Sequence, residues 1–218
     1  MSVPVKIDFV SDVSCPWCIV GLQALEQALA RVGDAVTVDL HFQPFELNPA
    51  MPPEGQDIDE HLAEKYGASP EQRAQSREAL RARGEALGFE FRMDKRSRIY
   101  NTFDAHRLLH WADGEGEGRQ LALKHALFRA YFTDGENPGD HTVLLRLARA
   151  VGLDGERAQQ ILASDEFAAE VRAQQRYYAE HGIHAVPAVI INDRHLISGG
   201  QPVETFERAL REIAVQSA

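Results

Sequence analysis

The sequence predicts an α/β fold in which a long helical segment interrupts a small β-sheet. Three observations support this class. The chain opens with two strand patterns separated by a helical one, its middle is dominated by helical patterns, and it closes with two more strand patterns and a helix. Alternation of apolar and polar residues is typical of strands, whereas apolar residues at three- and four-residue intervals indicate helices.

The first strand–helix–strand unit occupies residues 5–42. Residues 5–10 alternate apolar and polar side chains, and residues 36–42 do so again. Between them a helix is expected from about Pro16 to Arg31, ended by Gly33. The apolar residues at helical spacing that predict it are Leu22, Leu25, Leu29 and Val32. Two strands joined through a helix favour parallel pairing in one sheet.

The middle of the chain carries the helical patterns. Residues 48–55 form a proline-rich connector, after which no strand pattern follows until about His181. Apolar stripes at helical spacing lie within 105–112, 123–131, 143–151 and 167–178, with glycine-rich breaks between some of them. The charged residues of 71–83 are expected to form an exposed helix face. Residues 49–181 are therefore predicted to be an inserted all-helical domain.

The sheet returns near the C-terminus. Ala188–Ile191 is a continuous apolar run that suits a buried strand, Asn192–Asp193 predicts a turn, and His195–Ser198 predicts the partner strand of a hairpin. A closing helix follows. The order βαβ, helices, ββα predicts a thioredoxin-like fold (α/β) made of residues 1–48 and 182–218, with 49–181 inserted between them.

The two cysteines of the chain are the strongest chemical signal. Cys15 and Cys18 lie in a Cys-Pro-Trp-Cys motif where the first strand gives way to the first helix. The unpaired N–H groups and positive dipole at a helix N-terminus stabilise a thiolate, and a shift of the pKa from ~8.5 to ~5–6 is within the range of such motifs. We therefore expect Cys15 to be the exposed, low-pKa nucleophile and Cys18 to resolve the mixed disulfide.

Zinc binding is the structural alternative for a pair of cysteines in this spacing. Structural zinc sites usually need a second pair of ligands, and the chain has no other cysteine. His106 and His110 have the four-residue spacing of metal ligands, but a metal centre needs three or four converging groups. The pattern predicts no metal site and favours thiol chemistry.

Several segments together resemble the FrnE-like branch of the DsbA family. They are residues 12–18 with Gly21, residues 45–49, residues 101–110, residues 185–188 and residues 197–202. The resemblance spans nearly the whole chain. It implies a thioredoxin fold with a helical insertion, dithiol–disulfide exchange at Cys15 and Cys18, and a cis peptide bond between Val186 and Pro187, beside the dithiol.

The substrate is expected to meet residues around the dithiol. Pro16 and Trp17 lie between the two sulfurs, and Trp17 is interpreted as a platform for substrate rather than only a partly exposed aromatic residue. The backbone at Val186 and Pro187 is expected to pair with an extended substrate segment. Asp12 has two interpretations, a cap of the loop or a proton acceptor for Cys18, and the capping role is the expected one.

Two other functions compete with disulfide exchange. The kappa-class glutathione transferases and the hydroxychromene-carboxylate isomerases share the architecture, but they typically have serine at the nucleophile position, where this chain has Cys15. A non-enzymatic binding module with a vestigial dithiol is the third alternative. The presence of both cysteines favours exchange.

Composition narrows the partners. The 218-residue chain is 44% hydrophobic and 26% charged, as in ordinary soluble globular proteins, and its net charge of −10 argues against binding to nucleic acid or anionic membranes. No secretory signal or membrane-spanning run is recognisable, so a cytoplasmic protein is expected. We expect no bound cofactor, and protein or small-molecule thiols and disulfides as partners. Glutathione or a thioredoxin-type reductant would recycle the pair, and a homodimer is compatible with the sequence.

Overall fold

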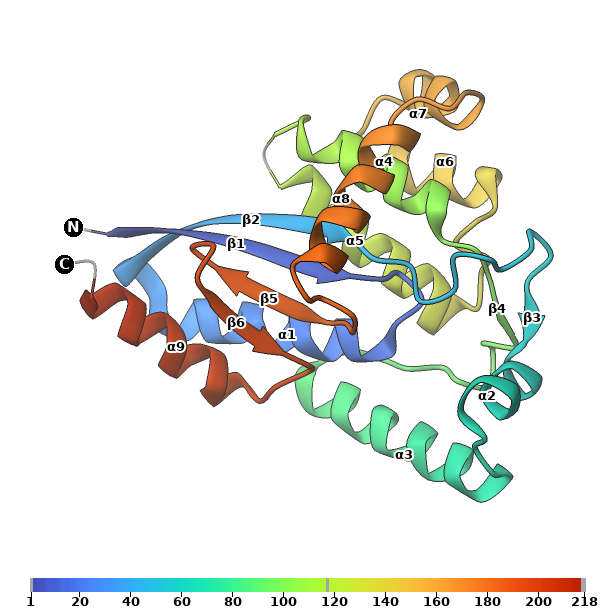
Figure 1. Ribbon diagram of the computed structural model, residues 1–218, viewed down its shortest axis with the longest axis horizontal. Coiled ribbons are helices and arrows are strands. Elements are labelled where there is room, and N and C mark those ends of the chain that lie inside the picture. Colours follow the sequence, from blue (N-terminus) through green and yellow to red (C-terminus); the bar gives the residue numbers. More distant parts are fainter. Residues whose placement is uncertain (1, 117, 217–218) are drawn as a thin grey trace.

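A four-stranded mixed sheet lies at the centre of the molecule, with helices on both faces (Figure 1). The computed structural model describes residues 2–116 and 118–216. The strands of the sheet, in spatial order, are β2 (Val36–Pro44), β1 (Val3–Ser11), β5 (Ala188–Ile191) and β6 (His195–Ser198). β1 runs parallel to β2 and antiparallel to β5, and β5 and β6 form a hairpin. The predicted α/β fold class is confirmed.

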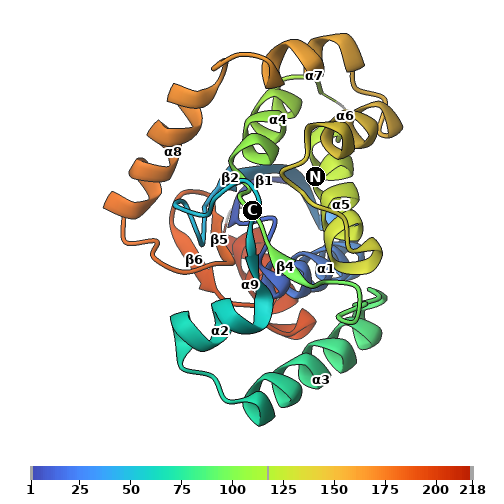
Figure 2. The same cartoon turned by 90° about the vertical axis from the view of Figure 1, so that its right-hand side faces the viewer.

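Helices cover the sheet in two layers (Figures 1 and 2). The helices are α1 (Pro16–Val32), α2 (Ile58–Tyr66), α3 (Pro70–Leu87), α4 (Phe103–Asp113), α5 (Arg119–Arg129), α6 (His141–Ala150), α7 (Gly155–Leu162), α8 (Ala168–Glu180) and α9 (Val203–Gln216). A short 3₁₀ turn, η1 (Gly33–Ala35), follows α1, and a π-helical turn, η2 (Ala130–Asp134), continues α5. α1 and α9 pack together on one face, while α4, α5 and α8 contact β2 from the other side.

Local sequence accounts for the element ends that position the site. Pro16 starts α1, where its missing N–H leaves no bond unmade, and Gly33 ends the helix at a positive φ of 58°. In the β5–β6 hairpin, Asn192 and Asp193 have positive φ angles of 51° and 55°, which Asn and Asp tolerate best after Gly. The turn that the sequence predicts at these two residues is confirmed.

The chain between β2 and β5 carries helices α2 to α8 and adds a second, very small sheet. Its helices α4 to α7 enclose a second apolar core, to which Val13 from the loop before α1 also belongs. Two-residue strands, β3 (Gln56–Asp57) and β4 (Arg98–Ile99), pair antiparallel beside α2. α3 packs against α1, and α5 packs against β2, so the insertion shares its packing with the sheet. The outermost residues of the predicted domain limits, 1 and 217–218, lie outside the described residues.

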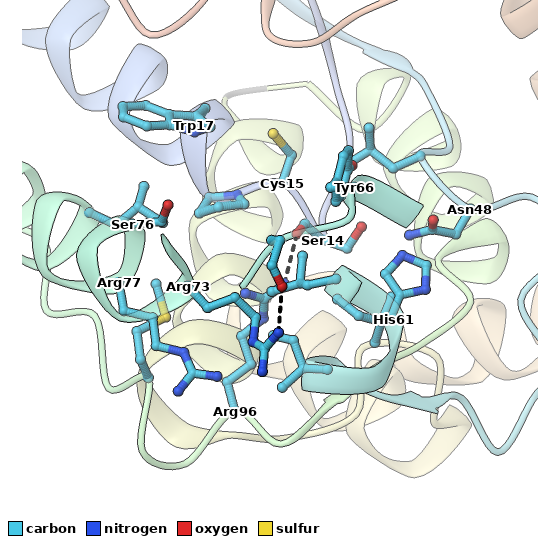
Figure 3. A pocket seen from close by; sticks show the side chains of 18 of the residues that line it. Ser14, Cys15, Trp17, Asn48, His61, Tyr66, Arg73, Ser76, Arg77 and Arg96 are labelled. Carbon is cyan, nitrogen blue, oxygen red and sulfur yellow. Dashed lines mark hydrogen bonds between the residues drawn. The ribbon is translucent and has the colours of Figure 1, made fainter. Parts of the chain in front are cut away.

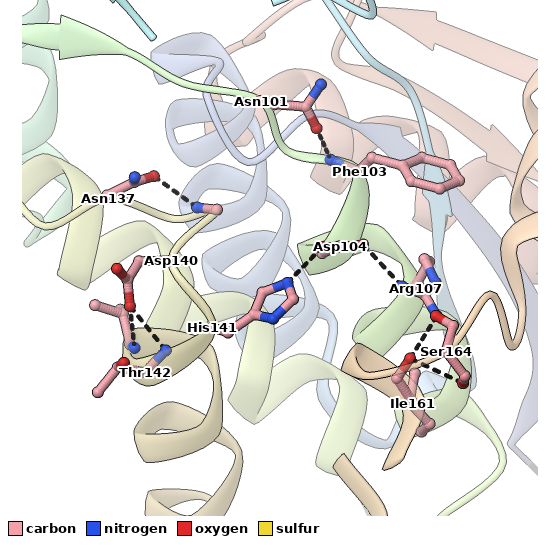
Figure 4. A network of polar contacts seen from close by, with 12 residues as sticks. Asn101, Phe103, Asp104, Arg107, Asn137, Asp140, His141, Thr142, Ile161 and Ser164 are labelled. Carbon is pink, nitrogen blue, oxygen red and sulfur yellow. Dashed lines mark hydrogen bonds and ion pairs between the residues drawn. The ribbon is translucent and has the colours of Figure 1, made fainter. Parts of the chain in front are cut away.

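A buried arginine ties the helices of the insertion together (Figure 4). Arg107 on α4 donates to the backbone carbonyls of Ile161 in α7 and of Ser164 just after it, and its Nη1 lies 2.8 Å from the carboxylate of Asp104. The same carboxylate contacts His141 Nε2 at the start of α6 at 2.7 Å. These contacts join α4 to α6 and to α7. No helix in the described ranges has the length and apolarity to cross a membrane.

Candidate active site

The two cysteines lie where β1 leads into α1. Cys15 is the N-cap residue of α1 and Pro16 occupies the first turn, as predicted. The Cys15 carbonyl accepts the N–H of Cys18 at 3.2 Å, and the Cys15 N–H donates to the Asp12 carbonyl at 3.2 Å. Both cysteines are free thiols. The Cys15 thiol therefore sits at the positive end of a seventeen-residue helix.

The prediction that Cys15 is exposed is wrong. Only 4% of its surface is accessible, and Cys18 is fully buried. The cause is tertiary, because the Val186 carbonyl from the far end of the chain lies 3.7 Å from the Cys15 Sγ. Cys15 lines a pocket, through which it is reached from solvent. Most of the other residues that line this pocket belong to the chain between β2 and β5.

The environment moves the acidities of the two thiols in opposite directions. A hydrogen bond with the Cys18 side chain, helped by the N–H groups of Cys18 and Trp17, lowers the pKa of Cys15 against burial and the Asp12 charge. Burial first, and then the interaction with Cys15, raises the pKa of Cys18 well above its usual range. Cys15 is thus the thiol that ionises first, in the direction that its place at the helix N-terminus predicts.

The loop before β5 closes over the pair. The Val186–Pro187 peptide bond is cis, which confirms the sequence prediction. Pro187 is buried against α1, where a Cβ on Gly21 would lie 3.0 Å from the proline Cγ. Val186 lines the pocket beside Cys15, whereas Pro187 does not. Glycine at position 21 lets this loop approach the helix closely.

Asp12 is the centre of a buried hydrogen-bond cluster below the dithiol. Its carboxylate accepts the N–H and hydroxyl of Ser14, the N–H of Leu47 at 2.7 Å and the hydroxyl of Thr102 at 2.8 Å. His106 Nε2 lies 3.4 Å away, too poorly aligned for a full hydrogen bond. Burial alone would raise the pKa of Asp12, but the interactions with His106, Leu47 and Thr102 lower it to about 2. Asp12 therefore ties the Cys15 loop to the segment after β2 and to the start of α4.

A pocket of about 410 Å³ opens beside Cys15 (Figure 3). Its walls come from the start of α1, the segment after β2, helices α2 and α3, the stretch before β4, and the Val186 loop. The Cys15 sulfur lies between Trp17 and Tyr66 at one side, and Arg73 and Arg77 project from α3 at the other. Trp17 is 45% exposed and lines the pocket together with Pro16. The volume is within the range of small-molecule sites.

Sequence reasoning missed the arginines of this pocket. Arg96 precedes β4 and is buried, with its guanidinium stacked 4.7 Å from the Tyr131 ring centre and 4.6 Å from that of Phe132. One Nη donates to the Ser14 carbonyl at 3.3 Å, while Nε has no hydrogen-bond partner among the described residues. The sequence offers one weak signal, the high arginine content of 73–83, which predicts only an exposed helix face.

Lys124 on α5 is a second unforeseen residue. Its side chain is fully buried, its Nζ has no hydrogen-bond partner in the described structure, and it lies 5.6 Å and 5.1 Å from the ring centres of Phe42 and Phe128. Burial lowers its pKa to about 8, against the attraction of Cys18, Asp12 and Cys15. A lysine between apolar neighbours on a helical stripe was the available signal.

Comparison with known proteins shows one family match over most of the chain and similar proteins of nearly the same length. The model of the DSBA-like thioredoxin domain family matches residues 6–211. A probable DsbA oxidoreductase from Streptomyces coelicolor is 35% identical, with a TM-score of 0.85, over 98% of this chain and 91% of that one. The uncharacterised protein YwbO of Bacillus subtilis (strain 168) is 29% identical over 97% of this chain and 98% of its own length.

A more distant structure has a different chemistry. A 2-hydroxychromene-2-carboxylate isomerase is 14% identical to this chain, with a TM-score of 0.71 and coverage of 97% of both chains. Identity this low establishes a shared fold and nothing about the reaction. The chemistry has to be argued from the residues around Cys15.

Proposed function

Because the chain belongs to the DSBA-like thioredoxin domain family, we propose that it is a thiol–disulfide oxidoreductase with Cys15 as nucleophile and Cys18 as resolving thiol. One observation carries the proposal. Two thiols one helical turn apart have pKa values shifted in opposite directions, that of Cys15 down and that of Cys18 up. Only the thiolate attacks a disulfide. Cys15 is therefore suited to attack the substrate, and Cys18, which stays protonated longer, to resolve the mixed disulfide.

The proposed reaction balances within the pair. The Cys15 thiolate attacks one sulfur of a substrate disulfide, and the other sulfur leaves as a thiolate and takes up a proton. Cys18 then loses its proton and attacks the Cys15 sulfur of the mixed disulfide, which releases the second substrate thiol. Two electrons pass to the substrate and a Cys15–Cys18 disulfide remains. The reverse sequence oxidises a substrate dithiol.

The electrons reside in the two sulfurs, so the proposed reaction uses no bound cofactor. Trp17 and Pro16 border the Cys15 sulfur, and the Val186 carbonyl lies 3.7 Å from it, which supports their role in substrate contact. The substrates would be protein or small-molecule thiols and disulfides. Glutathione or a thioredoxin-type reductant would return the pair to the dithiol state.

The test compares the wild type with Cys15→Ser and Cys18→Ser variants. The wild type should reduce insulin with dithiothreitol as reductant, and Cys15→Ser should not. Cys18→Ser should accumulate a mixed disulfide at Cys15, detectable by mass spectrometry and by peptide mapping. Equal turnover by the wild type and the Cys15→Ser variant would contradict the proposal.

The same preparations separate exchange from the glutathione-dependent alternative. Conjugation of glutathione to an aromatic electrophile, without any turnover of disulfides, would indicate a transferase or isomerase. The reduction potential of the pair in a glutathione buffer then gives the direction of electron flow. A value near −270 mV indicates a reductant and one near −120 mV an oxidant.

A further inference from the structure

The pocket beside Cys15 is strongly basic in a chain that is acidic overall. Arg73, Arg77 and Arg96 line it, and none of the described lining residues is an aspartate or glutamate. The net charge of the whole chain is −10. His61 also lines the pocket, but burial and then the nearby Lys65 charge lower its pKa and keep it neutral. The three guanidinium groups are therefore the charges that a ligand would meet.

These guanidinium groups are only partly neutralised. Asp59, outside the pocket lining, pairs with Arg73 at 3.2 Å and also with Arg77. The remaining hydrogen bonds of Arg73 and Arg96 are to the carbonyls of Ala68 and Ser14. One carboxylate thus pairs with two of the three arginines.

Arg96 points most directly to a ligand. It is 9% exposed and lines the pocket, and its Nε has no hydrogen-bond partner within residues 2–116 and 118–216. Stacking on the aromatic rings of η2 holds the guanidinium in place. A buried cationic donor without a partner is costly unless an anion completes it. Its other donor reaches the carbonyl of Ser14, the residue before the nucleophile.

Size and shape restrict the ligand to a small molecule. The cavity of about 410 Å³ fits a ligand of tripeptide size, and residues of α2 and α3 line it together with Cys15 (Figure 3). Apolar side chains such as Leu62, Leu80 and Met93 also line it. A ligand that fills it needs an apolar or amide body with carboxylates at the arginines.

We propose that this pocket selects small disulfides and thiols that carry carboxylate groups, and presents their sulfur to Cys15. The inference rests on the proposed exchange function and names its substrate class. The carboxylates lie at Arg73, Arg77 and Arg96, and the sulfur at Cys15. The substrate disulfide gains two electrons and two protons, and the protein dithiol becomes a disulfide.

The kinetic test compares oxidised glutathione, which is anionic, with cystamine, which is cationic. Arg77→Gln should lower kcat/KM for oxidised glutathione about tenfold, the value of one charge-assisted hydrogen bond, and leave cystamine within about twofold. Arg81→Gln is the matched control, because Arg81 lies one turn further along α3, pairs with Glu78 and Glu85, and does not line the pocket. Equal losses with both substrates, or none with oxidised glutathione, would overturn the proposal.

A second variant leaves every arginine in place. Ser76 lines the pocket and is exposed, so Ser76→Glu adds a negative charge there with little risk to the fold. It should lower kcat/KM for oxidised glutathione and raise it for cystamine, whereas Gln75→Glu, on the adjacent exposed position outside this pocket, should change neither. No difference between the two variants would count against an anion site.

A binding measurement separates this proposal from the exchange function. S-methylglutathione cannot exchange, so calorimetric titration of the Cys15→Ser variant reports the pocket alone. Binding that weakens about tenfold with Arg77→Gln and falls with added salt is expected. Absence of binding would overturn the pocket proposal even if exchange is found. Binding without any disulfide turnover by the wild type would overturn only the exchange function.

Discussion

Two buried charged residues act on the thiols, Asp12 on Cys15 and Lys124 on Cys18. Asp12 lies below the dithiol as a carboxylate with four hydrogen-bonding groups around it, and Lys124 approaches from α5 as an amine with no hydrogen-bond partner in the described structure. Both pKa values are shifted downward. For Asp12 this means that the folded protein stabilises the charged carboxylate, whereas for Lys124 it means that the folded protein destabilises the charged ammonium. They should therefore affect stability in opposite ways.

Lys124→Met tests the buried amine. At pH 7 the wild type keeps a buried ammonium without its hydration, which destabilises the folded state. The variant removes this cost but also loses the cation–π contacts. Its free energy of unfolding should therefore be about 1–3 kcal/mol higher than that of the wild type. The folded pKa of about 8 lies below the ordinary 10.5. Wild-type stability should thus rise between pH 8 and 10.5, and the advantage of the variant should shrink there. Urea unfolding at pH 7 and pH 10 measures both.

The same variant should act on Cys18. The Lys124 charge is one of the factors that lower the pKa of Cys18, so its removal should raise that pKa further. Resolution of the mixed disulfide should slow more than the first attack by Cys15, because Lys124 interacts more strongly with Cys18 than with Cys15. A variant that resolves as fast as the wild type would show that Lys124 has no part in the second step.

Asp12→Asn tests the hydrogen-bond cluster. The folded pKa of about 2 lies below the ordinary 3.8, so the carboxylate contributes stability above about pH 4 that is lost as the pH falls toward 2. The free energy of unfolding of the variant should be about 2.5 kcal/mol lower than that of the wild type at pH 7, and it should change less as the pH falls toward 2. Chemical unfolding from pH 2 to pH 7 gives the comparison, with Asp34→Asn, an exposed site, as control. Similar acid limbs in wild type and Asp12→Asn would contradict this account.

The chemistry of single residues could be predicted only as far as local structure determines it. The N-cap position of Cys15, with Pro16 behind it, follows from the strand–motif–helix order, and so does the order of ionisation of the thiols. The burial of Cys15 could not be predicted, because the carbonyl that covers its sulfur belongs to Val186, near the other end of the chain. Arg96 could not be found either, since its stacking partners lie more than thirty positions away in η2.

At the scale of elements, α3 carries the basic wall of the pocket. Its start is specified locally, by a capping box between Ser69 and Gln72, and it is mostly exposed, as the charged pattern of 71–83 predicts. Its position is set by close packing at Gly84, where a Cβ would lie 2.7 Å from the Phe89 carbonyl oxygen. The absence of a side chain at Gly84 therefore lets the helix pack closely against the segment that follows it.

Gly84→Ala should displace α3. Despite the better helix propensity of alanine, overpacking against the Phe89 backbone and the Phe91 ring should cost about 1–3 kcal/mol in unfolding free energy. Gly114→Ala is the control, since its added Cβ meets nothing closer than 3.6 Å. The displaced helix should also lower the preference for oxidised glutathione over cystamine. Unchanged stability and preference would show that the contact is readily relieved.

Elements with strong local signals were predicted closely, and those positioned by packing were not. Ala188–Ile191 and His195–Ser198 form strands with the predicted limits, because an apolar run and an Asn-Asp turn delimit them. β3 and β4 are two residues each and have no periodicity to detect. The pocket walls formed by α2 and α3 depend on where those helices dock, which their exposed faces do not encode.

For the whole molecule, the acidity of Cys15 links redox state to stability. A folded-state pKa below the unfolded value gives the reduced protein stability that is fully present above the unfolded pKa and is lost as the pH falls through the folded pKa. The oxidised protein has no such thiolate. At pH 7 the reduced form should melt at a higher temperature, by roughly 2–4 °C for each kcal/mol.

Calorimetric melting of both redox forms between pH 4 and pH 8 measures this difference. The gap should narrow toward pH 4 in the wild type. Cys15→Ser in reducing buffer should show no corresponding pH dependence. A reduced form that melts below the oxidised form at pH 7 would contradict the thiolate stabilisation.

The long insertion between β2 and β5 bears on how the protein is made. The Cys15 thiol and the Val186 carbonyl that covers it are 171 positions apart, and β5 pairs with β1 only once residues 188–191 have been synthesised. At ordinary translation rates, roughly 10–30 s separate the emergence of the two from the ribosome. Throughout that interval the nascent chain presents its reactive pair without the Val186 loop, so early encounters with cellular disulfides take place before the basic pocket is complete.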